Sequence, residues 1–192
     1  SASTRGWSRE RRAFWAFLSA GLGVTLGQSV YLNYYGLREP PFNINPNPRL
    51  MFYSAKHREA LNHLLYGIRE RKGFVQLTGE VGAGKTTICR ALLEHLGPNY
   101  ATALILNPVL NSDQLMKAIA MEFGLQVKGL DRLETVAALN QFLLDQVMQG
   151  HDAVLIIDEA QDLTPELLEQ VRLLSNLETD DRKLLQIVLL GQ

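Results

Sequence analysis

The chain has 192 residues and a formal net charge of −1, and 46% of its residues are hydrophobic and 20% are charged. This length can bury one full hydrophobic core, the composition excludes a wholly disordered chain, and the near-zero net charge predicts no strong overall attraction to nucleic acid or anionic lipid. The single cysteine, Cys89, excludes an intramolecular disulfide, and the four histidines show no metal-ligand spacing.

The first 29 residues differ in character from the rest of the chain. Residues 1–12 are polar and basic, and the apolar, glycine-containing run AFWAFLSAGLGVTLGQS follows them. Its uninterrupted apolar part is shorter than the roughly 20 residues that a helix needs to cross a bilayer. Three interpretations of this segment are open: an extension upstream of the working domain, a membrane-associating segment, or a cleaved signal. We expect residues 1–29 to be a poorly ordered or membrane-associating extension and the domain to occupy residues 30–192.

Helices and apolar strands alternate after a proline-rich lead-in. Residues 31–53 hold four of the seven prolines, so we expect them to be extended. Capping residues, glycine stops and hydrophobic periodicity predict the later elements. They are strands at 74–78, 101–107, 153–158 and 184–190, and helices at 55–71, 85–96, 113–124, 131–149 and 165–177. This alternation predicts an α/β fold, with an open parallel sheet covered by helices on both faces.

The stretch GEVGAGKTT, residues 79–87, fits the phosphate-binding pattern Gly-x-x-x-x-Gly-Lys-[Ser/Thr] between a predicted strand and a predicted helix. Its glycines let backbone N–H groups converge on phosphate oxygens, and the helix N-terminus favours an anion. Lys85 is expected to reach the β- and γ-phosphates and Thr86 to ligate Mg²⁺, while Thr87 either contacts the α-phosphate or packs. The candidate nucleotide-binding residues are Gly79, Glu80, Val81, Gly82, Ala83, Gly84, Lys85, Thr86 and Thr87.

A second motif lies at the end of the strand predicted at 153–158, where Asp158 and Glu159 follow an apolar run. Alone, such a pair is typical of a solvated strand end. Given the loop upstream, we expect Asp158 to hold hydrated Mg²⁺ and Glu159 to polarise the attacking water, from the tip of a strand neighbouring the loop. The carboxylate pair favours an ATP hydrolase over a small-molecule kinase, and the predicted ligands are ATP and Mg²⁺.

With both motifs in place, residues 30–192 resemble the AAA+ ATPase domain of the general secretion pathway protein A family. The resemblance rests on the lead-in YLNYYGLREPPFNINPNPRLMFY, on LTGEVGAGKTT, on LILNP, on residues 155–161 and on VLLGQ. It implies the additional-strand AAA+ form of the P-loop NTPase fold, and an ATP-driven switch that helps assemble a secretion or envelope complex. It also implies self-association as a ring or oligomer. The expected location is the bacterial cytoplasm, or the inner membrane through peripheral contact or a C-terminal tether.

The resemblance also implies residue roles. Besides Glu159 and Lys85, it places two further residues in the catalytic set. Asn107 matches the position that holds the catalytic glutamate until a partner binds, and Gln192 matches a sensor of the γ-phosphate. Asn107 is equally interpreted as a turn residue before a proline, and Gln192 as a frayed end. The lead-in at 50–53 and the pair His57 and Arg58 would border the adenine pocket. Cys89 is expected to be a small core residue.

The family's helical lid, with its sensor arginine, and its arginine finger lie beyond the fourth predicted strand. We therefore expect a partial core with an incomplete lid, and uncertain hydrolysis by this chain alone, because such an arginine contributes a factor of about 10³ or more. The alternative function is a nucleic-acid-associated AAA+ ATPase, either a transposition helper or an initiator-like loader. The near-neutral charge gives that alternative no support. A helicase, suggested by DEAQ at 158–161, is rejected because it needs a second domain.

Overall fold

The computed structural model describes residue 32 and residues 34–36, 53–179 and 182–192. The chain separates into two units, residues 1–52 and 53–192, and the second unit contains both sequence motifs. The extension predicted at 1–29, its boundary with the domain, and residues 50–52 of the predicted adenine pocket lie outside the described residues. The sheet and the helices that cover it belong to the second unit.

Four parallel strands form one sheet, as the sequence predicts. They are β1 (Phe74–Thr78), β2 (Tyr100–Ile105), β3 (Asp152–Ile157) and β4 (Leu185–Gly191), in the spatial order β1-β4-β3-β2. The expectation that the acidic pair follows a strand neighbouring the loop strand is therefore wrong, because β4 lies between β1 and β3. This inserted strand is what distinguishes the additional-strand form that the resemblance implies.

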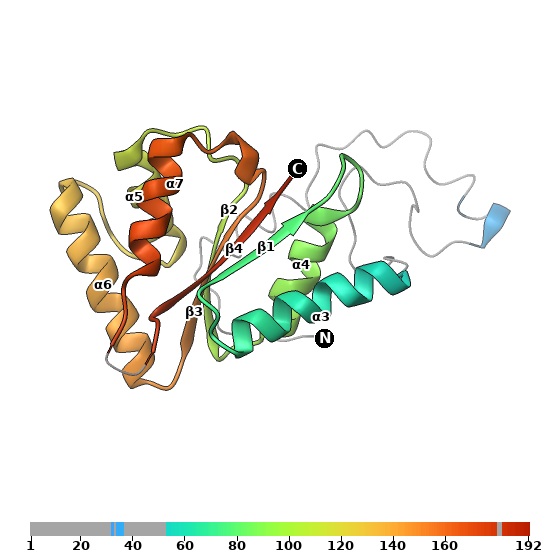
Figure 1. Cartoon of the computed structure of the whole chain (residues 1–192), viewed down its shortest axis with the longest axis horizontal. Helices are drawn as coiled ribbons and strands as arrows, with labels where there is room; N and C mark the ends of the chain where they lie inside the picture. The colour runs from blue at the N-terminus through green and yellow to red at the C-terminus, as the bar shows by residue number, and fades with distance from the viewer. Residues whose placement is uncertain (1–31, 33, 37–52, 180–181) are drawn as a thin grey trace. The chain divides into compact units, whose positions relative to one another are not determined.

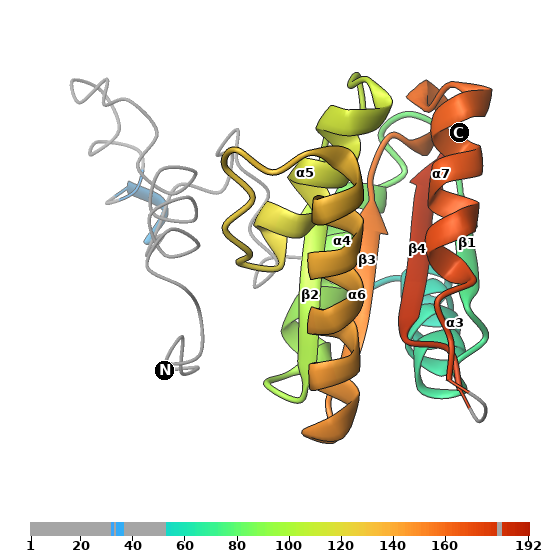
Figure 2. The same ribbon diagram turned by 90° about the vertical axis from the view of Figure 1, so that its left-hand side faces the viewer.

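Helices cover both faces of the sheet. Figures 1 and 2 show α3 (Ala55–Arg69) and α4 (Lys85–Leu96) on one face, and α5 (Ser112–Glu122), α6 (Arg132–Met148) and α7 (Pro165–Ser175) on the other. Alternate residues of β3 serve the two faces, as strand geometry requires. Ala153, Leu155 and Ile157 belong to the cluster under α5, α6 and α7, whereas Val154 and Ile156 are buried outside that cluster. Burial on both faces explains why the strand is continuously apolar.

Local signals start the helices that follow β2 and β3. Asn111 is the N-cap of α5, and it forms a reciprocal capping box with Gln114. Thr164 caps α7, and Pro165 occupies its first turn. Strands β2 and β3 end at Ile105 and Ile157, so Asn107 and Asp158 lie just beyond the strand ends. Both residues thus reach the carboxyl edge of the sheet, where open α/β sheets bind ligands.

Within the ranges that the structure describes, no helix combines the length and the apolar character that crossing a bilayer would need.

Candidate nucleotide site at the carboxyl edge of the sheet

The loop between β1 and α4 has the backbone that the glycine pattern predicts. Gly82 and Gly84 adopt φ values of 78° and 83°, in the left-handed region that side chains with a Cβ rarely occupy. Gly84 is the N-cap of α4, so the unpaired N–H groups of the first helical turn lie directly after the loop. The partial positive charge of that helix end favours an anion at this place.

Lys85 lies over its own loop. The residue is 9% exposed, and its ammonium donates to the carbonyl oxygens of Gly79, at 2.8 Å, and of Glu80, at 3.1 Å. These two bonds place a positive charge at the loop on the first turn of α4.

The two motifs meet at Thr86 and Asp158, which are 72 residues apart in the sequence. The Thr86 hydroxyl donates to Asp158 Oδ2 at 2.8 Å, and the other carboxylate oxygen accepts from the Glu159 backbone N–H at 3.0 Å. Asp158 is only 2% exposed. A buried carboxylate is costly unless it is hydrogen-bonded or binds a cation, and the two donors just named, the Thr86 hydroxyl and the Glu159 N–H, are both neutral.

This donor set fits a magnesium ion. Mg²⁺ prefers oxygen ligands and usually keeps several waters, so it needs only one or two protein groups. The Thr86 hydroxyl and the Asp158 carboxylate are two such oxygens, and Thr86 directly follows Lys85 in the first turn of α4. Across the described residues, no group of three or more His, Cys, Asp or Glu side chains is placed to hold a metal, so this site would hold Mg²⁺ through one carboxylate and one hydroxyl.

The side chain of Glu159 is hydrogen-bonded by Gln161, a residue that is not among the site residues predicted from the sequence. The backbone of Glu159 is left-handed, with φ 53° and ψ 41°, and the short helix η2 (Ala160–Asp162) follows. The turn brings Gln161 back so that its Nε2 donates to Glu159 Oε2 at 2.7 Å. The amide oxygen of Gln161 accepts from the backbone N–H of Gln192 at 3.2 Å. The signal available in the sequence was the position of Gln161, two residues after Glu159.

The end of β4 lies between the two motifs. The N–H of Gly79, the first loop residue, donates to the carbonyl of Gly191 at 3.1 Å. Gln192 therefore follows a residue bonded to the phosphate loop, and its own backbone contacts Gln161. Asn107 is engaged differently, because its Oδ1 accepts from the Val109 N–H at 3.3 Å. That bond corresponds to the turn interpretation of Asn107.

His57 bridges helix α3 and the phosphate loop. Its Nε2 lies 3.1 Å from the carbonyl oxygen of Ala83, and its Nδ1 lies 3.1 Å from the hydroxyl of Ser54, the N-cap of α3. Because a carbonyl only accepts, Nε2 donates to Ala83, and in the neutral imidazole Nδ1 then accepts from the serine hydroxyl. The place predicted for His57 at the border of the adenine pocket stays a prediction, and the structure shows its bond to the loop. The predicted role of Arg58 stays a prediction.

Cys89 lies one turn after Thr86 and is a core residue in the structure, at 1% exposed. Burial raises the pKa of its thiol to about 12, and the nearby negative charge of Asp158 acts in the same direction. The thiolate is the reactive form of cysteine. A thiol with this pKa is inert at neutral pH, which matches a packing role.

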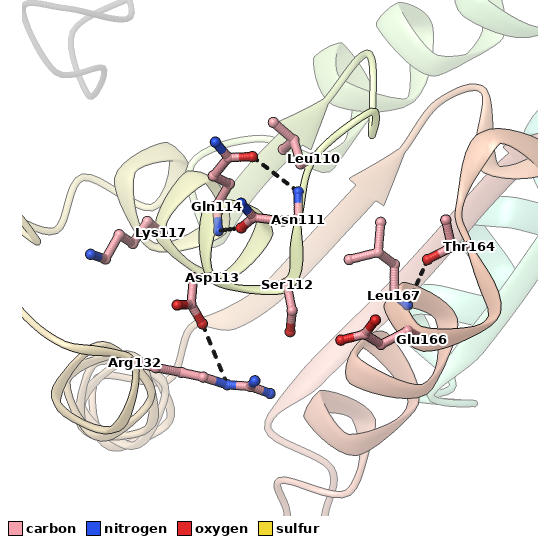
Figure 3. Close-up of a pocket in the computed structure, with 10 residues that line it drawn as sticks. All are labelled: Leu110, Asn111, Ser112, Asp113, Gln114, Lys117, Arg132, Thr164, Glu166 and Leu167. Carbon is pink, nitrogen blue, oxygen red and sulfur yellow. Dashed lines mark hydrogen bonds and ion pairs between the residues drawn. The ribbon is translucent and has the colours of Figure 1, made fainter.

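A separate cavity of about 570 Å³ lies near the N-terminal ends of α5, α6 and α7 (Figure 3). Asp113 from α5 and Arg132 from α6 form an ion pair of 3.9 Å there, and Glu166 of α7 faces the same space. Its lining includes no residue of the phosphate loop and neither acid of the pair that follows β3. The candidate nucleotide site and this cavity are distinct.

Comparison with known proteins agrees with this geometry. The family model described as AAA domain matches residues 68–192. General secretion pathway protein A of Aeromonas hydrophila is 49% identical over 164 residues, which are 85% of this chain and 30% of that protein.

Two solved structures share the fold. The ORC2 protein of Aeropyrum pernix, in ADPNP–ADP complexes, has a TM-score of 0.53 at 18% identity and covers 71% of this chain and 40% of its own. Cdc6p of Pyrobaculum aerophilum has a TM-score of 0.55 at 21% identity and covers 74% of this chain and 40% of its own. The present chain thus spans well under half the length of these proteins. The predicted fold class and the resemblance to general secretion pathway protein A are confirmed, and the chain belongs to the AAA domain family of P-loop ATPases.

Proposed function

We propose that this chain binds ATP with Mg²⁺ and hydrolyses it. The observation that carries the proposal is the 2.8 Å bond between the Thr86 hydroxyl and Asp158, two oxygen ligands from motifs 72 residues apart. Family membership supports nucleotide binding, and the buried carboxylate beside the loop supports the divalent cation.

The proposed roles follow the placement of each group. The backbone of residues 79–87 and the N-terminus of α4 bind the phosphates, with Lys85 supplying positive charge. Thr86 and Asp158 hold Mg²⁺, which when bound neutralises charge on the phosphates. Glu159 accepts a proton from the attacking water. Gln192 senses the γ-phosphate from the end of β4. For Asn107, the bond to the Val109 N–H supports the turn role over the role of holding the catalytic glutamate.

Isothermal titration calorimetry with ATP, with and without Mg²⁺, tests the binding step. We expect Asp158→Asn to fold like the parent, because an amide can still accept from the Glu159 N–H and meet the Thr86 hydroxyl, but to lose the gain in affinity that Mg²⁺ gives. Asp162→Asn is the matched control, since Asp162 is an exposed acid on the adjacent turn. The proposal fails if the folded parent binds no ATP, or if Asp158→Asn keeps the full Mg²⁺ effect.

Hydrolysis is tested by release of phosphate from ATP. Replacing Glu159 with Gln removes the base but keeps an oxygen and a similar volume, so we expect ATP affinity within about twofold of the parent and turnover lower by about 10²-fold or more. Equal turnover in the parent and in Glu159→Gln would remove Glu159 from the proposed mechanism.

We further propose that ATP binding switches contacts between copies of this domain and with proteins of a secretion or envelope complex, at the cytoplasmic side of the membrane. The support is the 49% identity to a protein named general secretion pathway protein A. Sedimentation velocity with and without Mg²⁺-ATP tests self-association. A sedimentation coefficient that nucleotide leaves unchanged, at concentrations well above the measured Kd, would argue against a nucleotide-driven assembly.

A nucleic-acid-associated ATPase is the alternative, and no specific observation favours it, because identities of 18% and 21% to the two solved structures indicate a shared fold alone. Binding to DNA that weakens steeply with added salt would favour it.

A further inference from the structure

We infer that Gln161 is a positioning residue for Glu159, and that it links the catalytic carboxylate to the end of β4 and so to the phosphate loop. The inference rests on the proposed role of Glu159 as the base. It assigns to Gln161 the contact with the glutamate that the family resemblance placed at Asn107.

The two partners of Gln161 fix the orientation of its amide. A carboxylate can only accept, so the 2.7 Å contact with Glu159 Oε2 requires the NH₂ group of Gln161. A backbone N–H can only donate, so the 3.2 Å contact with Gln192 requires the amide oxygen. Both requirements are met by one orientation, so the side chain spans the two groups as a bridge.

The bridge continues into the phosphate loop through backbone atoms. Gly191 precedes Gln192, and its carbonyl accepts from the N–H of Gly79 at 3.1 Å. A side chain on Gly191 would place its Cβ 3.1 Å from the amide oxygen of Gln161, so the strand end and the amide are also in close packing contact. Glu159 is thereby tied, through one side chain and one strand end, to the residue that opens the phosphate loop.

The chemistry of an amide suits this position. An arginine or lysine would pair with Glu159, neutralise it and weaken it as a base, whereas the NH₂ group of a glutamine fixes one oxygen and leaves the negative charge. The other carboxylate oxygen stays available to accept a proton. Glu159 also starts from a left-handed backbone, an uncommon conformation for a residue other than glycine, which indicates that its surroundings hold it there.

The contact is tested without nucleotide, by NMR of the whole protein. Replacing Glu159 with Ala should shift the side-chain NH₂ signals of Gln161, and Gln161→Met should shift the backbone amide signal of Gln192. Gln161→Glu sets two carboxylates against each other, so its side chain should turn away and the Gln192 signal should shift as well. In the reciprocal double variant, Gln161→Glu with Glu159→Gln, the hydrogen bond reverses its polarity. The NH₂ signals at position 159 should then be shifted from those of the single variant Glu159→Gln, while turnover stays as low as in that single variant.

The positioning role of Gln161 is tested by measuring kcat and KM for ATP separately. Gln161→Met and Gln161→Glu should lower kcat by about tenfold, a part of the roughly 10²–10⁴-fold that a positioned base contributes, and change KM by less than about twofold. The matched controls are the same two substitutions at Gln141, whose amide also donates to a carboxylate, Asp145 Oδ1 at 2.9 Å, on the exposed side of α6. These controls should keep the parent kcat.

Three results would overturn the inference. The first is that Glu159→Ala leaves the side-chain NH₂ signals of Gln161 unshifted. The second is an unchanged kcat in both Gln161 variants, at whatever level the parent turns over. The third is a raised kcat, which would mean that the amide restrains Glu159 from reacting. Calorimetry on the same samples separates these results from a failure of the proposed function, in which the parent itself binds no ATP.

Discussion

Replacing His57 with alanine removes the side chain that connects α3 to the phosphate loop. The imidazole contacts the Ala83 carbonyl and the Ser54 hydroxyl, each at 3.1 Å. The first contact holds the peptide before Gly84, the N-cap of α4, and the second belongs to the cap of α3. The variant should therefore lose both affinity for ATP and stability.

The size of each effect can be worked out from these two bonds. A net contribution of about 0.5–1.5 kcal/mol per hydrogen bond predicts a total loss of about 1–3 kcal/mol in the free energy of unfolding. For a unit of this size that loss lowers Tm by about 3–10 °C. Only the bond to Ala83 concerns the loop, so ATP affinity should fall by about 1 kcal/mol, which is about fivefold in Kd.

Calorimetric titration with Mg²⁺-ATP and thermal unfolding without nucleotide measure the two effects separately. His57→Gln retains an N–H donor that can reach Ala83 and should recover most of the affinity, whereas His57→Phe keeps the ring volume without the donor and should not. Parent-like ATP affinity in both His57→Ala and His57→Phe would refute the reasoning, because the histidine would then stabilise α3 without positioning the loop.

Three further predictions concern the core and its helices. Burial raises the pKa of the Cys89 thiol from 9.0 to about 12. Its stabilising contribution is therefore complete below pH 9 and is lost as the pH rises toward 12, by about 1.4 kcal/mol per pH unit. Urea unfolding from pH 8 to 10.5 should show a steeper loss of stability in the parent than in Cys89→Ala. Gly67→Ala should destabilise the protein by about 1–3 kcal/mol, because the added Cβ would lie 2.5 Å from Val75 Cγ2. This loss should outweigh the better helix propensity of alanine. A urea midpoint higher than that of the parent would contradict the close packing of α3 on β1. Asp131→Ala removes the capping box of α6 and should lower the free energy of unfolding in urea by about 1 kcal/mol. ATP affinity should not change, since α6 is remote from the phosphate loop. A weakened ATP affinity would contradict that separation.

The sequence alone was sufficient for the features that local patterns encode. The glycines and Lys85 of the phosphate loop, the apolar runs that became β1 to β4, and the capping residues before α5 and α7 all lie where their patterns predict. Each of these features depends on a few neighbouring residues, through backbone freedom at glycine, side-chain periodicity or a cap. The acidic pair was found in the same way, because it follows an apolar strand directly.

Strand order was decided only by the tertiary structure. The insertion of β4 between β1 and β3 depends on how the crossover helices pack on the two faces, and all four apolar strands look alike in the sequence. That order produces the contacts that no local pattern encodes, such as Thr86 with Asp158, Gln161 with the end of β4, and His57 with Ala83. The physical reason is that these bonds join segments far apart in the chain, so their geometry exists only once the sheet has formed.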